Sequence, residues 1–225
     1  MEFDIIRFTF IRNKIHKKLT MKIKILIISV LICNVMNAQG LSPYIRNFQN
    51  SHKILYTKGH AKSKGLDIAL KYPATWHLKE GRRPHVVYLL TDTINDTGLF
   101  SITIKDVPEE FKKLLKQTDK EDFKDVINLF YASICNSISE TGGYNRVYSK
   151  ECEGTQIEGL DAFTISYYAD TERAHMKITT YNVHHLVYYD FKLISLLFMF
   201  YLPECENQVS ADIFSNIIFN TLVIN

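Results

Sequence analysis

Apolar and polar residues alternate in residues 65–72, where every second side chain is apolar. Neighbouring side chains of a strand point to opposite faces, so this pattern predicts a strand with one buried face. Pro73 ends the strand, because proline has no N–H to offer to a sheet. The same reasoning predicts two further strands, at residues 86–90 and 99–105, joined by a turn at residues 95–98.

After the third strand the pattern changes to a helical period. Residues 108–115 open with a proline and two acids and continue with two lysines, which suits the first turn and the dipole of a short helix. A longer helix follows, because Thr118 and Glu121 have the spacing of a capping box, and Gly142-Gly143 ends it. Its apolar residues recur every three or four positions and predict one buried stripe. The stripe consists of Phe123, Ile127, Phe130, Ile134 and Ile138.

Strand patterns return in the second half of the chain. The predicted elements are strands at 147–152, 160–168, 174–188 and 193–202, a helix at 207–218 and a last strand at 221–224. The stretch Leu193–Leu202 is apolar on both sides, which is typical of a central strand covered on both faces. Residues 39–61, by contrast, are polar and are expected to be irregular, with one helical turn near Tyr44–Phe48.

The order of strands, helices, strands and helix predicts a single α+β domain over residues 62–225. The same order of elements argues for a sheet that is mainly antiparallel. The chain of 225 residues is 46% hydrophobic and 12% aromatic, which is enough for a sizeable core.

A short apolar run at residues 25–36 follows a basic stub that begins at Met21, and Asn37-Ala38-Gln39 closes it. This pattern is typical of a secretory signal peptide, so we expect residues 21–38 to direct export and to be cleaved after Ala38. An uncleaved N-terminal anchor is the alternative, although a span needs about 20 apolar residues. The expected location is periplasmic or secreted, with no transmembrane segment after cleavage.

Residues 1–20 form an extension upstream of Met21. One interpretation is that translation starts at Met21 and the extension is not made. The other is a basic arm that binds nucleic acid or lipid. Cys33 would suit a lipidation site, but Ile32 stands before it where a small residue is needed.

The net charge of the chain depends on this N-terminal region. The full chain has 27 basic and 24 acidic residues, and the first 38 residues contain seven basic and two acidic ones. The remaining 187 residues therefore have 20 basic and 22 acidic residues, a net charge of −2. No basic footprint for nucleic acid remains.

Three cysteines remain after cleavage: Cys135, Cys152 and Cys205. Disulfides form outside the cytoplasm, but an odd number allows at most one bridge within the chain. We favour a Cys135–Cys152 bridge, which would link the long helix to the next strand. The alternative is three buried, inert thiols.

Several local motifs resemble those of the PsbP-like family. They are Tyr72-Pro73-x-x-Trp76, Ile157-x-Gly159-Leu160-x-Ala162 and the pair Tyr167-Tyr168. The family includes an oxygen-evolving accessory protein of photosystem II, a Ran-release factor and DcrB-type envelope proteins. The resemblance covers residues 62–225 and implies an α/β/α sandwich, with helices on both faces of the sheet. It also implies a role in binding or assisting other macromolecules, but it assigns no binding residue.

The best candidate surface site is the loop after the first turn, which groups Arg82, Arg83 and His85. The planar guanidinium group of arginine suits carboxylates and phosphates. A solvated hairpin loop without function is the alternative interpretation. Trp76, the only tryptophan, is either an exposed binding anchor or a core residue beside the proline turn.

Motifs for catalysis and metal binding are absent from the sequence. It contains no Gly-x-Ser-x-Gly elbow, no phosphate-binding glycine loop and no zinc-ligand spacing. His184 and His185 are adjacent, and adjacent residues of a strand point to opposite faces, so one metal ion rarely binds both. We therefore expect no catalytic residues, no metal and no cofactor.

Three functional hypotheses follow, in order of preference. The first is an exported, non-catalytic binding or accessory protein of the bacterial cell envelope, whose partner is another envelope protein or a small ligand. The second is a small-molecule or lipid-binding protein with an aromatic pocket at a sheet edge. That pocket would use Tyr167, Tyr168, Tyr188 and Tyr189. The third is a hydrolase.

Overall fold

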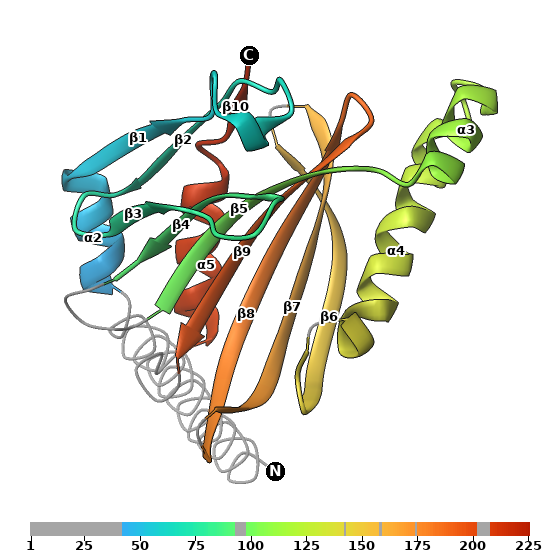
Figure 1. Cartoon of the computed structure of the whole chain (residues 1–225). Coiled ribbons are helices and arrows are strands. Elements are labelled where there is room, and N and C mark those ends of the chain that lie inside the picture. The colour runs from blue at the N-terminus through green and yellow to red at the C-terminus, as the bar shows by residue number, and fades with distance from the viewer. Residues whose placement is uncertain (1–41, 93–97, 142, 158, 174, 202–207) are drawn as a thin grey trace, which may run out of the picture. The chain divides into compact units, whose positions relative to one another are not determined.

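The computed structural model describes residues 42–92, 98–141, 143–157, 159–173, 175–201 and 208–225. Its elements, in chain order, are α2 (Ser42–Asn50), β1 (His52–Tyr56), the short 3-10 helix η1 (Ala61–Ser63), β2 (Ile68–Pro73), β3 (His77–Glu80), β4 (Val86–Thr91), β5 (Gly98–Asp106), α3 (Glu109–Gln117), α4 (Phe123–Thr141), β6 (Arg146–Ile157), β7 (Leu160–Arg173), β8 (Met176–Tyr189), β9 (Lys192–Tyr201), α5 (Gln208–Phe219) and β10 (Val223–Ile224) (Figure 1). The predicted signal peptide, its upstream extension, Cys205 and most of the predicted turn at 95–98 lie outside the described residues.

A seven-stranded sheet forms the centre of the fold, with the strand order β3-β4-β5-β9-β8-β7-β6. Every neighbouring pair in it is antiparallel. Strand β9 lies in the middle, as its two-sided apolar pattern predicts, and it pairs Phe198 with Phe100 of β5. These two rings stack with centroids 4.4 Å apart. The fold class is therefore α+β with a dominant antiparallel sheet, as expected.

A second, three-stranded sheet has the order β1-β2-β10 and was not predicted. The expectation that residues 39–61 are irregular was wrong, because this segment contains α2, β1 and η1. Its apolar signal is weak because few of its side chains enter the core, among them Phe48 of α2 and Leu55 of β1, while Ile54 and Tyr56 stay exposed. Strand β1 is held in place by backbone pairing with β2, and backbone pairing leaves no signature in the sequence.

Helices cover both faces of the large sheet, as the PsbP-like resemblance implies. The neighbouring residues Leu186 and Val187 of β8 point to opposite faces and belong to two different apolar clusters. The cluster with Val187 includes α5 and the small sheet, and the cluster with Leu186 includes α4. Figure 1 shows α4 beside β6 and β7, and α5 on the other side of the sheet. None of the helices in the described residues has the length and apolarity to cross a bilayer.

The buried face of α4 is rotated relative to the predicted stripe. Its fully packed residues are Ile127, Tyr131, Cys135 and Ile138. Phe123 of the predicted stripe is 37% exposed, and Phe130 and Ile134 are only half-buried. The rotation follows from Tyr131, whose hydroxyl accepts a 2.6 Å hydrogen bond from the backbone N–H of Tyr188. Sequence periodicity counts apolar residues and cannot detect such a polar anchor.

The capping box expected at the start of α4 does not form. The hydroxyl of Thr118 donates to the backbone oxygen of Leu114 at 2.8 Å, so this residue closes α3 instead. Helix α4 begins only at Phe123, beyond Glu121.

A disulfide joins Cys135 of α4 to Cys152 of β6, with Cα atoms 6.5 Å apart. This is the pairing that the sequence analysis favours. It ties the helix to β6, which is an edge strand of the large sheet. The bridge thereby holds α4 on its face of the sheet.

Replacing both bridged cysteines, in a Cys135→Ser/Cys152→Ser variant, should lower the free energy of unfolding by about 3 kcal/mol, because a loop of this length then regains its entropy in the unfolded chain. Urea unfolding measures the loss. Reductant should destabilise the wild type and a Cys205→Ser control, but not the double variant. A wild type that is insensitive to reductant would contradict the bridge.

Candidate functional site

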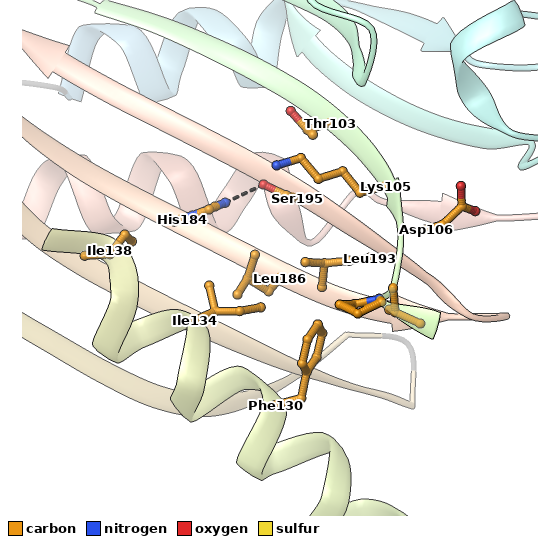
Figure 2. A pocket seen from close by; sticks show the side chains of 12 residues that line it. Thr103, Lys105, Asp106, Phe130, Ile134, Ile138, His184, Leu186, Leu193 and Ser195 are labelled. Atoms are coloured by element: carbon orange, nitrogen blue, oxygen red, sulfur yellow. Dashed lines mark hydrogen bonds between the residues drawn. The ribbon is translucent and has the colours of Figure 1, made fainter. Parts of the chain in front are cut away.

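A cavity of about 330 Å³ lies between α4 and the sheet. Strands β5, β8 and β9 contribute to its walls, and the segment that leads from β5 into α3 closes one end. Most of its lining is apolar. Phe130, Ile134 and Ile138 line it from α4, and Leu186 and Leu193 line it from the sheet (Figure 2). Its volume falls within the range of about 300–1,000 Å³ that small-molecule sites have.

The cavity exists because one helix cannot cover a seven-stranded sheet. A helix is about 10 Å wide and strands lie ~4.8 Å apart, so a single helix covers about two strands. Helix α4 packs on β6 and β7, at one end of the sheet. Beyond it the same face of the sheet continues along β8, β9 and β5. The half-buried residues Phe130 and Ile134 lie at this margin of the helix.

A histidine and a serine form the polar centre of the cavity. The imidazole Nε2 of His184 is hydrogen-bonded to the hydroxyl of Ser195 on the neighbouring strand (Figure 2). The imidazole Nδ1 is buried and has no hydrogen-bond partner among the described residues. Burial, with a smaller contribution from the charge of Lys105, lowers the pKa of His184 to about 4. The imidazole is therefore neutral at neutral pH.

Strand β5 contributes the charged groups of the cavity and one of its two hydroxyl groups. Thr103 and Lys105 are two residues apart and therefore share a face of the strand. Figure 2 shows the Lys105 side chain extending toward Ser195, whereas Asp106 points away. The Asp106 carboxylate is bound by the ammonium group of Lys64, and this hydrogen bond is the main reason that the pKa of Asp106 is lowered. The cavity therefore has one ammonium group, two hydroxyl groups and a neutral imidazole.

This arrangement suits binding better than serine catalysis. A serine nucleophile needs a base whose pKa lies near the working pH, and that base is normally held by a third polar group. The imidazole of His184 has a pKa of about 4, and its Nδ1 atom has no partner in the described part of the chain. It is therefore a weak base toward Ser195 at neutral pH.

His185 faces away from the cavity, as expected of a residue next to His184 in a strand. Its ring stacks on Phe219 of α5 with centroids 4.3 Å apart, and its Nδ1 is 2.9 Å from the Thr164 hydroxyl. Burial lowers its pKa to about 3. The two histidines cannot bind one metal ion, and the described residues contain no cluster of three or more metal-ligating side chains.

The structure keeps Arg82, Arg83 and His85 of the predicted site in one loop and buries Trp76. Arg82 and Arg83 are exposed in the loop between β3 and β4, and His85 is half-buried at its end. Burial, followed by the charges of Lys105 and Arg83, lowers the pKa of His85. Trp76 is only 4% exposed.

Trp76 is a core residue, so its interpretation as an exposed anchor was wrong. Its ring packs against Phe214 of α5, with centroids 6.0 Å apart. The tight turn after β2 directs it inward, since its backbone N–H donates to the carbonyl oxygen of Pro73 at 3.0 Å. The neighbouring arginine loop is also tight, because a Cβ on Gly81 would lie 2.3 Å from the Val86 oxygen.

The cavity does not lie at the sheet edge where the sequence predicts an aromatic pocket. None of Tyr167, Tyr168, Tyr188 and Tyr189 lines it. Tyr167 is 1% exposed and packs under α4, and Tyr168 points to the opposite face, where it stacks on Tyr148. Adjacent tyrosines in a strand cannot converge on one pocket. The cavity combines residues that the sequence analysis did not connect, because only strand register brings β5, β8 and β9 together.

Comparison with known proteins finds similarity at the level of structure. No protein-family model matches the sequence, and no curated protein matches it. The chain is similar to the cyanobacterial PsbP protein CyanoP of Synechocystis, with 13% identity, a TM-score of 0.48 and coverage of 76% of this chain and 92% of that one. A PsbP protein is thus among the solved structures that resemble this chain.

Two further solved structures are similar to this chain. One is LpqN of Mycobacterium tuberculosis, a protein involved in cell envelope biogenesis, with 14% identity, a TM-score of 0.43 and coverage of 82% of this chain and 96% of that one. The other is a protein of Bacteroides thetaiotaomicron, with 12% identity, a TM-score of 0.37 and coverage of 70% of this chain and 45% of that one. Identities this low do not transfer a function.

Acid should destabilise the protein through His184. Between its ordinary pKa of 6.5 and the folded value of about 4, the unfolded chain binds a proton that the folded chain does not. The free energy of unfolding should therefore fall as the pH falls through this window, by up to ~1.4 kcal/mol per pH unit. A His184→Gln variant, which keeps a partner for Ser195, should show a shallower fall between pH 7 and pH 4.5 in urea unfolding.

Exposed His77 on β3 provides the control for this measurement. A His77→Gln variant should keep the slope of the wild type. Equal slopes in the wild type and the His184→Gln variant would contradict the burial of the His184 imidazole in the folded state.

Proposed function

We propose that this protein is an exported, non-catalytic binding protein that holds a small amphipathic molecule in the cavity beneath α4. The cavity itself carries the proposal. A mostly apolar site of about 330 Å³ with a few polar groups gathered in it has the composition of a small-molecule site. This proposal combines the accessory role with the ligand-binding role that the sequence leaves open.

The position of the cavity also supports binding. Ser195 and Leu186 lie on central strands, and a rigid sheet holds polar groups at fixed positions better than a loop does. The disulfide of Cys135 stabilises α4, which carries the opposite wall. A preformed site loses less conformational entropy when a ligand binds.

Two observations support export. The segment at residues 21–38 has the pattern of a signal peptide. The disulfide between Cys135 and Cys152 is of a kind that persists in oxidising compartments and is rare in the cytosol. N-terminal mass spectrometry of the exported protein tests the cleavage after Ala38, and the same measurement on the uncleaved precursor tests the start at Met21.

Filling the cavity should abolish binding of a neutral amphipathic probe. Ile134 lines the cavity and is half-buried, so an Ile134→Trp substitution places a large ring in that space. We expect octan-1-ol to bind the wild type in isothermal titration calorimetry, and to bind the Ile134→Trp variant at least tenfold more weakly. The proposal fails if neither octan-1-ol nor a charged amphiphile of the same chain length binds the wild type.

A matched control lies on the same helix. Leu129 is 70% exposed and lies outside the cavity, so a Leu129→Trp variant adds the same ring elsewhere on α4. It should bind octan-1-ol as the wild type does. Equal binding by both tryptophan variants would place the probe outside the cavity.

The exposed side chains of Arg82 and Arg83 favour a second binding site on this protein, separate from the cavity, for an acidic partner. Neither Arg82 nor Arg83 forms a salt bridge with another residue in the described ranges. Both therefore offer free guanidinium groups on a loop whose shape Gly81 fixes.

Replacing both arginines, in an Arg82→Gln/Arg83→Gln variant, should change the free energy of unfolding by less than about 0.5 kcal/mol, because both side chains are exposed. The variant should capture less of the partner that the wild type retains from envelope extracts. A Lys53→Gln/Lys58→Gln variant controls for the loss of two surface charges. Unchanged capture by the arginine variant would remove this contact.

A further inference from the structure

We propose that the cavity beneath α4 selects an amphipathic monocarboxylate, with Lys105 binding the carboxylate and the apolar walls enclosing a chain of about eight carbons. This inference rests on the proposed function and adds the chemical class of the ligand. Three features carry it: the charge in the cavity, the hydroxyl groups beside that charge, and the volume that remains for a tail.

Lys105 supplies the uncompensated charge. Its ammonium group is directed toward Ser195 and has no carboxylate partner among the described residues. The nearest acid along the strand, Asp106, is paired with Lys64 and points out of the cavity. Lys105 is exposed at the cavity and is thus available to a negatively charged ligand.

Two hydroxyl groups complete the polar end. Thr103 and Ser195 line the cavity on the neighbouring strands β5 and β9. When the hydrogen of the neutral His184 imidazole is on Nε2, Ser195 accepts that hydrogen bond and its own hydroxyl hydrogen is available to a ligand. One ammonium group and two hydroxyl groups match the lone pairs of a single carboxylate.

The charge balance favours a carboxylate over a phosphate. One ammonium group compensates one negative charge, and the paired Asp106 also borders the cavity. A phosphate monoester carries nearly two negative charges at neutral pH, and the single ammonium group would compensate only one of them. Arginine, the usual partner for bidentate phosphate binding, does not line the cavity.

The volume limits the tail. A cavity of about 330 Å³ lies at the small end of the range of about 300–1,000 Å³ for small-molecule sites, so it suits a short ligand such as octanoate. The walls that would enclose its chain are the side chains of Phe130, Ile134, Leu186 and Leu193.

The test compares octanoate, octan-1-ol and octyl phosphate in isothermal titration calorimetry. We expect the wild type to bind octanoate more tightly than the alcohol or the phosphate. A Lys105→Met variant keeps the length of the side chain and removes its charge. It should bind octanoate about tenfold more weakly and octan-1-ol within a factor of two of the wild type.

Two further measurements distinguish a specific contact between Lys105 and the carboxylate from a general effect of removing a surface charge. Lys113 is exposed on α3 outside the cavity, so a Lys113→Met variant should bind both ligands as the wild type does. The screening length falls from ~20 Å to ~4 Å when the salt concentration rises from about 20 to about 500 mM. This change should weaken binding of octanoate to the wild type, but not binding of octan-1-ol. This second measurement needs no variant.

The outcomes distinguish this inference from the function on which it rests. If octan-1-ol binds and octanoate binds no more tightly, the ligand-binding function stands and the carboxylate assignment falls. Equal loss of both ligands in the Lys105→Met variant, or tighter binding of octyl phosphate than of octanoate, also overturns the assignment. If no probe binds the wild type, the function fails together with the inference.

Discussion

Covering both faces of a wide antiparallel sheet is the constraint on which the rest of this structure depends. Strands spaced by ~4.8 Å make a seven-stranded sheet about 30 Å wide, and each helix covers only about two strands. On one face the chain adds a three-stranded sheet to α5, so both together form one large core. On the other face α4 packs at one end only, and the cavity results from this incomplete cover.

The disulfide and one tyrosine fix the position of α4 on the sheet, and so fix where the sheet is left uncovered. Cys135 ties α4 to the edge strand β6, and the buried Tyr131 binds the backbone of β8 through its hydroxyl. Burial raises the pKa of Tyr131 to about 12, so this hydroxyl keeps its proton and stays a neutral partner. Together they turn Phe130 and Ile134 toward the cavity, so that a core helix also forms one wall of the cavity.

The sequence predicted the large elements because their signals are local. Strand alternation in residues 65–72 and the helical period after Thr118 each depend on neighbours within one element, and the structure has an element at each place. The bridge of Cys135 and Cys152 could be favoured because the two cysteines lie on consecutive predicted elements. Segments with few buried residues were missed, since β1 is held mainly by backbone pairing with β2 and leaves little trace in the pattern of side chains.

By itself, the sequence determined the fold class, the order of the larger elements, the signal-like N-terminal segment and the absence of motifs for metal or phosphate binding. Tertiary structure alone decided that Trp76 is a core residue and that Lys105, His184 and Ser195 share one cavity. These three residues lie on three different strands. They share a face only because of the strand order and the register, since a shift of one residue would turn a side chain to the opposite face of the sheet. Periodicity gives each strand its two faces, but only long-range pairing decides which faces lie together.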